Sequence, residues 1–425
     1  MKLESIALHH GYESDPTTKS AAVPIYQTSS YTFDSTQHGA DLFDLKVPGN
    51  IYTRIMNPTT DVLEKRVAEM EGGIAGLAVA SGMAAITYAI QCLCEVGDNI
   101  VSTSQLYGGT YNLFAHTLPK QGVEARLIPA DDFDAFEAAI DSKTKAVFCE
   151  SIGNPMGNIV DIVKLSEIAH RHGVPLIVDN TVATPVLCRP FELGADIVIH
   201  SLTKYIGGHG TSIGGIIVDS GKFDWVANAE RFAVMNTPDP SYHGVVYTEA
   251  FGPAAFIGRC RVVPLRNTGA AISPLNSFQI MQGLETLCLR MERHCENAEK
   301  LANYLNNHPK VNWVNYAALA DSPYNAACKK ITGGQASGIL SFGVNGGSVG
   351  GGQFIDALQM ILRLVNIGDA KSLACHPAST THRQLNPQEL ENAGVSEDLV
   401  RISVGIENID DIIADVSQAL DAVAV

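Results

Sequence analysis

The chain has 425 residues, of which 46% are hydrophobic and 17% are charged, and its formal net charge is −16 at pH 7. A chain of this length exceeds one ordinary hydrophobic core, so we expect two domains. The acidic excess is not offset by a basic patch, which argues against nucleic acid or an anionic membrane surface as a partner.

The first 60 residues predict an extended arm. Pro16, Pro24, Pro48 and Pro58 interrupt this segment, which has little helical periodicity. Such an arm either crosses a subunit interface or follows the surface of its own chain, and the composition favours neither. The opening residues lack the basic, apolar and cleavage-site pattern of a signal peptide, so we expect a cytoplasmic protein.

Nine cysteines are scattered along the chain, most of them inside apolar runs. This odd number predicts reduced thiols in the core of a cytoplasmic protein. Cys92 and Cys94 form a CxC pair, and no second pair stands at metal-ligand spacing, so we expect no structural metal. No run of 18 or more apolar residues predicts a membrane span.

Helical and strand patterns alternate from about residue 60. Segment 61–71 has apolar residues at helical spacing, with Asp61 as the expected N-cap, and 161–172 is the clearest later amphipathic stretch. The expected strands are 76–80, 99–103, 125–129, 146–150, 175–179, 196–200 and 214–218. This alternation predicts a mostly parallel sheet covered by helices on both faces.

Beyond residue 265 the pattern predicts a smaller α/β domain with a mixed sheet. The expected elements are a helical stretch at 274–307, strands at 311–316 and 337–344, a helix at 353–363, a strand at 399–404 and a helix from about 409. The Gly-rich segment 343–352 lacks the GxxxxGK[ST] pattern and predicts a surface loop. The expected division is an arm at 1–60, a large domain at 61–265 and a small domain at 266–425.

Two expected strands end in residues suited to an aromatic phosphorylated cofactor, since ligands of open α/β sheets bind at the carboxyl ends of strands. Strand 196–200 runs into Ser201, Thr203 and Lys204, where the lysine suits a Schiff-base amine and the hydroxyls suit a phosphate. A lysine in a solvated turn is the alternative. Asp179 ends another strand, and its carboxylate needs a partner such as a protonated pyridine nitrogen. An aspartate that caps the next turn is the alternative there.

Two more strand ends add to this set. Ser81, Gly82 and Met83 follow strand 76–80 and open a helix, whose free N–H groups make an anion site compatible with an ordinary serine N-cap. Tyr107 follows strand 99–103 and suits stacking on a flat ring or acid–base chemistry, although a buried tyrosine is the plainer interpretation.

Asn154 and Arg401 carry groups that suit an amino-acid substrate. Asn154 adds an amide at the same edge of the sheet, and Arg401 lies within an apolar strand. A guanidinium in such a strand needs a carboxylate partner, which either the substrate or an internal salt bridge supplies.

Over essentially its whole length the chain resembles the Cys/Met-metabolism family of pyridoxal-phosphate (PLP) enzymes. The combination of SLTKYIGGHG with VDNT at this spacing is highly specific. The matching segments are YTRIMNPT (52–59), SGMAA (81–85), LYGGTY (106–111), ESIGNP (150–155), VDNTVATP (178–185), SLTKYIGGHG (201–210) and VRISVGIEN (400–408). Within the family, GHGTSIGG (208–215), TPDPSYHG (237–244) and the extra length around 225–265 resemble the O-acetylhomoserine sulfhydrylases.

The resemblance implies the PLP-dependent transferase fold of type I, which is aspartate-aminotransferase-like, in a dimer usually built into a homotetramer. It implies that Lys204 holds PLP as a Schiff base, with Asp179 on the pyridine nitrogen and Tyr107 stacked on the ring. The implied phosphate ligands are Ser81, Gly82, Met83, Ser201 and Thr203, joined by Tyr52 and Arg54 from the neighbouring subunit. The implied ligands of the substrate carboxylate are Asn154, Arg401 and the region of Ser372.

The function expected from this resemblance is γ-replacement on O-acetyl-L-homoserine by sulfide, with Lys204 as the base and Tyr107 assisting departure of acetate. Methionine γ-lyases carry a cysteine where this chain has Gly109, which argues against a methionine γ-lyase activity. Cystathionine enzymes carry GHSD where this chain has Gly208-His-Gly-Thr211, which argues against a cystathionine activity. The alternatives are O-succinylhomoserine or O-acetylserine sulfhydrylation, γ-elimination, and a non-catalytic binding module. A metal hydrolase is a further alternative, but its candidate ligands lack metal-ligand spacing and acidic partners; they are His200, His209, His376 and His382.

Overall fold

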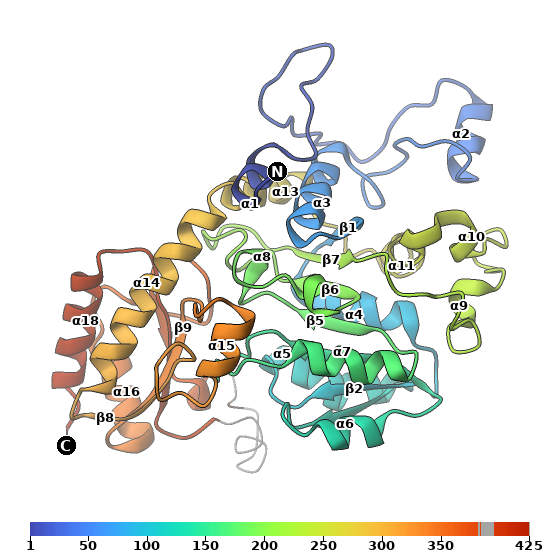
Figure 1. Cartoon of the computed structure of the whole chain (residues 1–425). Coiled ribbons are helices and arrows are strands. Elements are labelled where there is room, and N and C mark those ends of the chain that lie inside the picture. The colour runs from blue at the N-terminus through green and yellow to red at the C-terminus, as the bar shows by residue number, and fades with distance from the viewer. Residues whose placement is uncertain (381–382, 384–394, 425) are drawn as a thin grey trace.

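Two sheets organise the chain in a computed structural model that describes residues 1–380, 383 and 395–424. A seven-stranded sheet, coloured light blue to green in Figure 1, lies beside a five-stranded sheet drawn in orange and red. The predicted combination of a large and a smaller α/β region is therefore confirmed.

The large sheet is mostly parallel, as predicted. Its strands are β1 (Ala75–Val79), β2 (Asn99–Thr103), β3 (Glu124–Ile128), β4 (Thr144–Glu150), β5 (Leu176–Asp179), β6 (Ile197–His200) and β7 (Gly215–Asp219). They are arranged in the order β1-β7-β6-β5-β4-β2-β3. Strand β7 runs antiparallel to both of its neighbours, and the other four pairs are parallel. The carboxyl ends of β4, β5 and β6 therefore meet at one edge.

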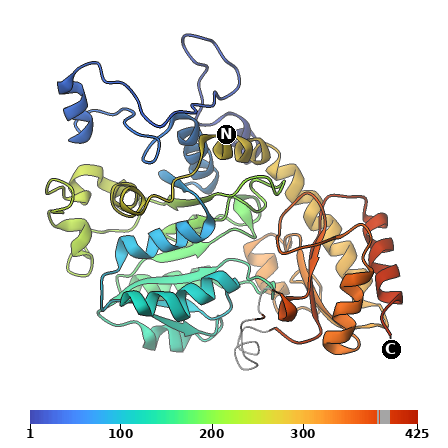
Figure 2. The same cartoon turned by 180° about the vertical axis from the view of Figure 1, so that it is seen from behind.

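Side chains along the central strands alternate between two hydrophobic clusters, because successive residues of a strand point to opposite faces. Val178 of β5 and Val198 of β6 belong to the cluster that includes helix α7 (Ile162–Arg171). Ile177 and Ile199 belong to the cluster that includes helix α4 (Gly82–Leu93). Helix α7 faces the viewer in Figure 1, and α4 faces the viewer in Figure 2. Both faces of the sheet are thus covered.

The second sheet is mixed, with strand order β10-β11-β12-β9-β8. Its strands are β8 (Val311–Asn315), β9 (Ile339–Val344), β10 (Leu362–Arg363), β11 (Leu373–Cys375) and β12 (Leu399–Ser403). Only β10 and β11 pair in parallel. The longer helices of the C-terminal half are α13 (Pro274–Leu284), α14 (Leu287–Asn306), α16 (Gly347–Ala357) and α18 (Ile409–Asp421).

The remaining elements are mostly short. The other helices are α1 (Leu3–His9), α2 (Thr36–Phe43), α3 (Pro58–Glu71), α5 (Gly108–Asn112), α6 (Phe133–Ala139), α8 (Thr184–Leu187), α9 (Ala233–Asn236), α10 (Tyr247–Phe251), α11 (Ala255–Cys260), α12 (Arg266–Thr268) and α15 (Asn325–Ile331). Single π or 3₁₀ turns occur at Leu113–Thr117, Leu118–Gln121, Pro190–Leu193, Gly252–Ala254, Arg261–Leu265 and Pro377–Ser379. Between α1 and α3 the chain extends away from both sheets, in blue at the top of Figure 1.

The start of α3 differs from the prediction that Asp61 is the N-cap. The helix begins at Pro58, and the side chain of Asn57 accepts a hydrogen bond from the Thr59 N–H at 3.0 Å. Proline suits the first helical position because its missing N–H has no acceptor there. The Asn-Pro pair therefore sets the start one turn earlier.

The C-terminal half contains two further corrections. The predicted stretch 274–307 is two helices, α13 and α14, and the predicted surface loop 343–352 contains the start of α16, which ends at Ala357 and not at 363. A Cβ added to Gly351 would lie 2.8 Å from Cδ2 of His376. Glycine here allows the helix to pack closely, so a composition typical of loops belongs to a helix that is buried on one side.

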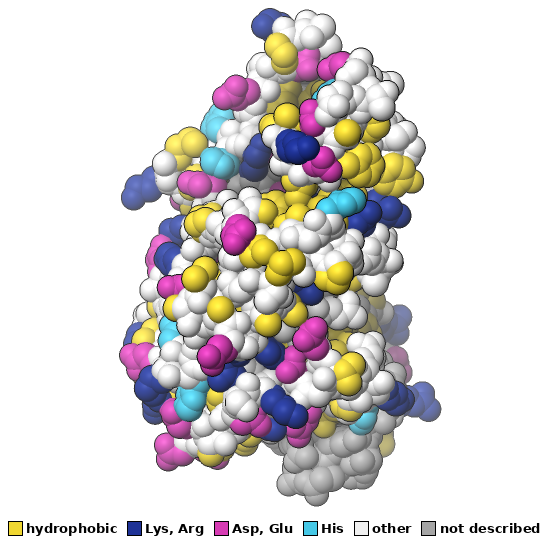
Figure 3. Space-filling view, turned by 90° about the vertical axis from the view of Figure 1, so that its right-hand side faces the viewer, with side chains coloured by type: hydrophobic (Ala, Val, Ile, Leu, Met, Phe, Trp, Pro, Cys, Tyr) yellow, Lys and Arg dark blue, Asp and Glu magenta, His cyan; other side chains and the backbone are white. Residues whose placement is uncertain are grey.

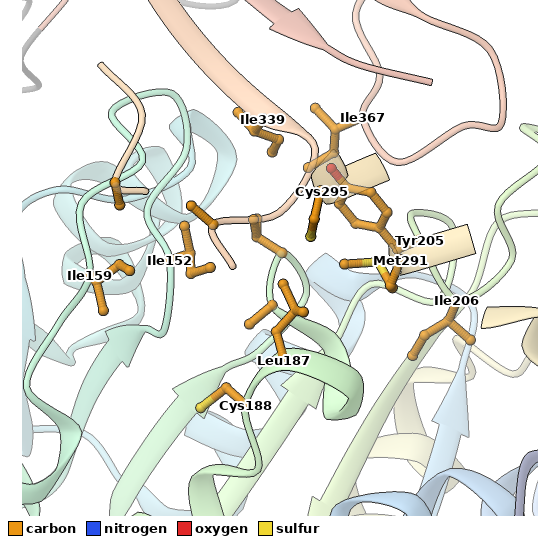
Figure 4. Close-up of a cluster of buried hydrophobic side chains, with 14 of the residues drawn as sticks. Ile152, Ile159, Leu187, Cys188, Tyr205, Ile206, Met291, Cys295, Ile339 and Ile367 are labelled. Carbon is orange, nitrogen blue, oxygen red and sulfur yellow. The ribbon is translucent and has the colours of Figure 1, made fainter. Parts of the chain in front are cut away.

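A cluster of buried side chains joins the two sheets (Figure 4). Tyr205 and Ile206 follow β6, Met291 lies on α14 and Ile339 lies on β9. The Tyr205 side chain is fully buried, and its ring meets that of His294 edge-on at 5.1 Å between centroids. The residues that follow β6 are thereby fixed against the second sheet.

We predict that Tyr205→Ala lowers the free energy of unfolding by about 3–5 kcal/mol, because it leaves a cavity in this cluster. Urea unfolding at fixed protein concentration measures the change. Leu289→Ala on α14 is the matched control, since Leu289 is 70% exposed, and we expect a change below about 0.5 kcal/mol there. Equal losses in the two variants would contradict the prediction.

Candidate active site

A cavity of about 250 Å³ lies at the carboxyl ends of β1, β4, β5 and β6. Its polar lining residues are Ser81, Gly82, Tyr107, Glu150, Asn154, Asp179, Thr181, Ser201, Thr203, Lys204, Asn366 and Arg401. Its apolar lining residues are Met83, Ile86, Ile152, Val182, Ile213, Val365 and Ile367. Arg401 comes from β12, and residues 365–367 precede β11, so the second sheet completes the cavity.

Lys204 extends its amine into this cavity, where Nζ donates to Oδ1 of Asn366 at 2.6 Å. Burial, and then the positive charge of Arg401, lower the pKa of this amine to about 8. The backbone is held in a turn, because the Gly208 N–H donates to the Lys204 carbonyl at 2.7 Å. A lysine with a lowered pKa spends more time neutral, and the neutral amine is the nucleophile and base.

Asp179 ends β5 directly beside Glu150, its register partner on β4. Burial raises the pKa of Asp179, while hydrogen bonds from Thr181 and the charge of His200 lower it. Burial and the charge of Asp179 raise the pKa of Glu150 well above its usual value. Two neighbouring buried carboxyls cannot both ionise freely, so Glu150 holds the proton and Asp179 carries the charge.

The first turn of α4 makes an anion site at one end of the cavity. Ser81 caps the helix by accepting from the Ala84 N–H at 3.1 Å. Within the described part of the chain, the N–H groups of Gly82 and Met83 have no acceptor. A Cβ on Gly82 would lie 2.7 Å from Cβ of Ser201, so only glycine allows this approach. Free N–H groups at a helix start bind phosphate well.

The hydroxyls after β6 have unequal freedom. Oγ1 of Thr203 donates to the Gly214 carbonyl at 3.2 Å. No hydrogen bond engages the Ser201 hydroxyl among the described residues, whereas the Ser201 N–H donates to Oγ1 of Thr181 at 2.8 Å. Ser201 is therefore the freer donor of the two.

Tyr107 lies at the start of α5 and is 43% exposed. Its backbone N–H donates to Oε1 of Glu150 at 2.6 Å. A Cβ on Gly109 would lie 2.6 Å from Cε1 of the tyrosine, so the absence of a side chain at Gly109 leaves room for the ring. The position of this aromatic ring depends on both neighbours.

Arg401 is a buried guanidinium with no carboxylate partner among the described residues. Its Nη1 donates to Oδ1 of Asn154 at 3.1 Å, and its Nη2 donates to the Asn366 carbonyl at 3.0 Å. Its Nε is buried and has no hydrogen-bond partner within the same part of the chain. The internal salt bridge that the sequence allowed for Arg401 is therefore absent among the described residues. An anionic ligand would balance the charge of this guanidinium.

Three predicted ligands lie outside the cavity. The hydroxyl of Ser372 donates to Oε2 of Glu407 at 2.8 Å and accepts from the Gly405 N–H at 2.8 Å, so the structure does not support a contact with substrate. Arg54 lies over the ring of Tyr52 at 5.2 Å from its centroid, and neither residue lines the cavity of its own chain. Their predicted role in a neighbouring subunit stays a prediction.

Sequence reasoning missed three polar lining residues as site candidates, together with most of the apolar lining. Glu150 ends an apolar strand just as Asp179 does, so the signal was present. Thr181 follows Asp179 by two positions and was within reach of the same argument. Asn366 lies between β10 and β11, where no pattern in the sequence indicated a site.

The histidines of the metal-hydrolase alternative do not gather. His200 contacts Glu71 at 2.6 Å, His209 contacts its own turn at the Gly207 carbonyl, and His376 lies between Ser379 and Glu397. His382 lies outside the described residues. In the described ranges no group of three or more His, Cys, Asp or Glu side chains could hold a metal ion. No described helix is long and apolar enough to cross a membrane.

The cavity fits pyridoxal phosphate. It offers unsatisfied N–H groups and a free hydroxyl for a phosphate, the Lys204 amine for an aldehyde, and the Asp179 carboxylate for a ring nitrogen. The unbalanced guanidinium of Arg401 remains available for a second, carboxylate-bearing molecule.

Comparison with known proteins gives a consistent result. A model of the family described as Cys/Met metabolism PLP-dependent enzyme matches residues 4–421. The chain is 52% identical to the homocysteine synthase of Schizosaccharomyces pombe, covering 98% of both chains. It is 52% identical to the O-acetyl-L-homoserine sulfhydrylase of Leptospira meyeri, covering 99% of this chain and 96% of the relative.

A solved structure is similarly close. The crystal structure of a Campylobacter jejuni protein described as O-acetylhomoserine (thiol)-lyase superposes with a TM-score of 0.97 at 45% identity, covering 99% of this chain and 100% of the other. That structure contains N'-pyridoxyl-lysine-5'-monophosphate.

We predict that the Lys204 amine in cofactor-free protein titrates near pH 8, because burial and Arg401 disfavour its charged form. Peptide mass spectrometry after brief trinitrobenzenesulfonate labelling over a pH series measures the midpoint. A lysine in a short model peptide, which titrates at about pH 10.4, serves as the control. Coincident midpoints for the two lysines would refute the assignment.

Proposed function

Because the chain belongs to the Cys/Met metabolism PLP-dependent enzyme family, we propose that it converts O-acetyl-L-homoserine and sulfide to L-homocysteine and acetate, with PLP as its cofactor. Relatives about half identical over nearly their full length carry this activity in their names. The observation that carries the proposal is the joint cavity of Lys204 and the unpaired Arg401. It provides one amine for the cofactor and one guanidinium for an amino-acid carboxylate.

Bound PLP supplies an electron sink for the electrons released when a proton leaves the substrate Cα. Asp179 holds the proton of the cofactor ring nitrogen, which strengthens that sink. Lys204 takes the Cα proton and then moves a proton at Cβ, and its lowered pKa lets it act in both directions. Arg401 and Asn154 orient the substrate through its carboxylate.

The γ-replacement exchanges one bond at Cγ for another. The Cγ–O bond breaks and acetate leaves with the electron pair, and the sulfur of HS⁻ then forms a bond to Cγ. Lys204 returns the protons to Cβ and Cα, so the sum is O-acetylhomoserine plus sulfide giving homocysteine plus acetate. Tyr107 stands at the open side of the cavity, where its phenol can donate a proton to the leaving acetate.

The charges of the cavity favour an acetyl over a succinyl leaving group. Lys204 and Arg401 are the cationic side chains among the described lining residues. The first attaches the cofactor and the second binds the substrate carboxylate, so this chain offers no third cation to a succinyl carboxylate. O-acetylserine is one carbon shorter, so its leaving group would lie at Cβ instead of Cγ, and its reaction would be a β-replacement instead of the proposed γ-replacement.

We assign the chain to a homotetramer built from dimers that exchange N-terminal arms. The first 60 residues expose Ile25, Tyr26, Phe33, Phe43, Val47 and Tyr52, and contiguous exposed apolar residues typically mark protein interfaces. Beneath the arm, a cavity of about 430 Å³ runs between residues 43–76 and residues 242–266. Figure 3 shows hydrophobic side chains gathered in this upper part of the molecule. In such a dimer Tyr52 and Arg54 would reach the phosphate of the partner's cofactor.

We assign the enzyme to the cytoplasm. All nine cysteines are free, and seven of them are buried, which suits a compartment that keeps thiols reduced. The substrates are small molecules, and the net charge of −16 speaks against nucleic acid as a partner.

We predict that purified protein with PLP forms homocysteine and acetate from O-acetylhomoserine and sulfide, and that Lys204→Ala abolishes both products and the visible absorbance of the bound cofactor. Product analysis by mass spectrometry should be run in parallel with O-succinylhomoserine and O-acetylserine, and without sulfide. Faster turnover of either analogue would replace the proposed substrate. Release of 2-oxobutanoate without sulfide at the same rate would indicate a γ-lyase.

We predict that mixing Arg54→Ala and Lys204→Ala proteins restores activity that neither has alone. In a hybrid dimer one cavity combines an intact Lys204 with an intact Arg54 of the partner, so about a quarter of the wild-type activity should return after random reassortment. Activity measured after refolding the mixture tests this, and mixing Lys204→Ala with Asp179→Ala, which belong to the same cavity, is the control. Equal recovery in both mixtures would contradict the exchange of arms.

A further inference from the structure

A buried polar network lies directly behind the strand ends that form the cavity. Three of its members are each next in the chain to a residue that lines the cavity. The pairs of network residue and lining residue are Ser151 with Glu150, Asn180 with Asp179, and His200 with Ser201. Neighbouring residues of a strand point to opposite faces. Glu150, Asp179 and Ser201 continue the face covered by α4, whereas the network residues continue the opposite face.

Glu71 is the residue at which this network converges. It is the last residue of α3, on the face opposite to α4, and its side chain is fully buried. Its Oε1 accepts from Nδ2 of Asn180 at 2.9 Å and lies 2.6 Å from Nε2 of His200. The hydroxyl of Ser151 donates to Oδ1 of Asn180 at 2.8 Å. One carboxylate oxygen thereby connects the ends of β4, β5 and β6.

The network is not saturated. Oε2 of Glu71 and Nδ1 of His200 are buried without a hydrogen-bond partner in the described part of the chain. Apolar residues of similar volume would hold the same strands without leaving two polar atoms unpaired, because a buried unpaired polar group costs free energy. A role beyond packing explains why a carboxylate and an imidazole occupy this place.

The network also constrains Asp179. Asn180 also donates from Nδ2 to the carbonyl of Cys188, labelled in Figure 4, so its position directly after Asp179 is fixed on two sides. Burial raises the pKa of Asp179, and the positive charge of His200 opposes that rise.

Other titratable and charged groups surround the network, and the guanidinium of Arg189 lies beside Gly72, the residue after Glu71. Burial raises the pKa of both neighbouring thiols, so they stay neutral, and Glu150 holds a proton. The titratable groups packed here are Glu71 from α3, Cys149 and Glu150 from β4, Asp179 from β5, Cys188 after α8 and His200 from β6.

We propose that Glu71 is a positioning residue of the active site, which ties Asn180 to His200 behind the sheet and so fixes the ends of β5 and β6 that present Asp179 and Ser201 to the cofactor. This inference rests on the proposed function. Glu71 touches neither cofactor nor substrate, because α3 lies on the far face of the sheet. Its effect reaches the cavity through Asn180 and His200.

The test compares Glu71→Gln with wild-type protein and with Asp196→Asn. Glutamine keeps the size of the side chain but replaces the carboxylate that Asn180 and His200 share, so Asp179 is held less firmly toward the Thr181 hydrogen bonds that lower its pKa. Since Asp179 must be ionised, we expect the acid limb of kcat/KM to move to higher pH by about one unit. We also expect the dissociation constant of PLP, measured by absorbance titration of apoenzyme, to rise about tenfold.

Asp196→Asn is the matched control. Asp196 is a buried carboxylate that contacts His170 at 2.8 Å and accepts from the Leu176 N–H, at the opposite ends of the same two strands. We expect it to lower the thermal midpoint while leaving the PLP dissociation constant and the acid limb unchanged. If Glu71→Gln behaves in the same way, the inference is overturned.

Ser151→Ala keeps the inference testable if Glu71→Gln does not fold. It removes only the hydroxyl that donates to Asn180, so it should weaken PLP binding in the same direction by a smaller factor. PLP binding as tight as in wild-type protein would show that the network does not reach the cavity and would overturn the inference. Failure of the wild-type protein to form homocysteine would instead refute the proposed function, which separates the two failures.

Discussion

The parallel register of β4, β5 and β6 is the constraint on which the rest of the site depends. Glu150 pairs with Asp179 in the ladder, and Asp179 pairs with Ile199, so the three strands end together. Because side chains alternate at each strand end, one residue faces the cavity and its neighbour faces the buried layer behind. A shift of one residue in a strand would exchange its two sets, and in β5 it would bury Asp179 away from the cofactor.

The cavity contains one pair of neighbouring carboxyls and one pair of neighbouring cations, and in each pair one member takes the neutral form more readily. Asp179 and Glu150 are neighbouring carboxyls, of which the second retains its proton. Lys204 and Arg401 are neighbouring cations, and the lysine becomes the more easily deprotonated of the two because guanidinium does not lose its proton in proteins. The repulsion that costs stability in the free cavity therefore prepares a neutral amine and an ionised carboxylate, which are the forms the chemistry needs.

The second sheet supplies what the first cannot. Arg401 lies about 200 positions beyond Lys204, yet both line one cavity. Tyr205, next to the lysine, packs against His294 of α14, and buried Arg290 of that helix donates to the Tyr205 carbonyl at 2.7 Å. The same contacts that join the sheets thus fix the distance between the amine and the guanidinium.

The sequence by itself determined the order of elements and the chemistry at each strand end. Apolar periodicity placed the strands of the large sheet within a few residues, and Lys204, Asp179 and Ser81 follow strands whose carboxyl ends must meet. The Asn57 cap of α3 was a local signal that this reasoning overlooked, because Asp61 offered a second candidate one turn later. The Gly-rich start of α16 escaped it because close packing against His376 depends on a neighbour distant in the chain. Tertiary structure alone decided that Asn366 receives the lysine amine, that Ser372 turns to Glu407, and that Arg401 has no internal carboxylate. Each of these three contacts depends on which side chains from distant parts of the chain are brought together by the packing of the two sheets. The residue pattern along one strand or helix carries no information about such contacts.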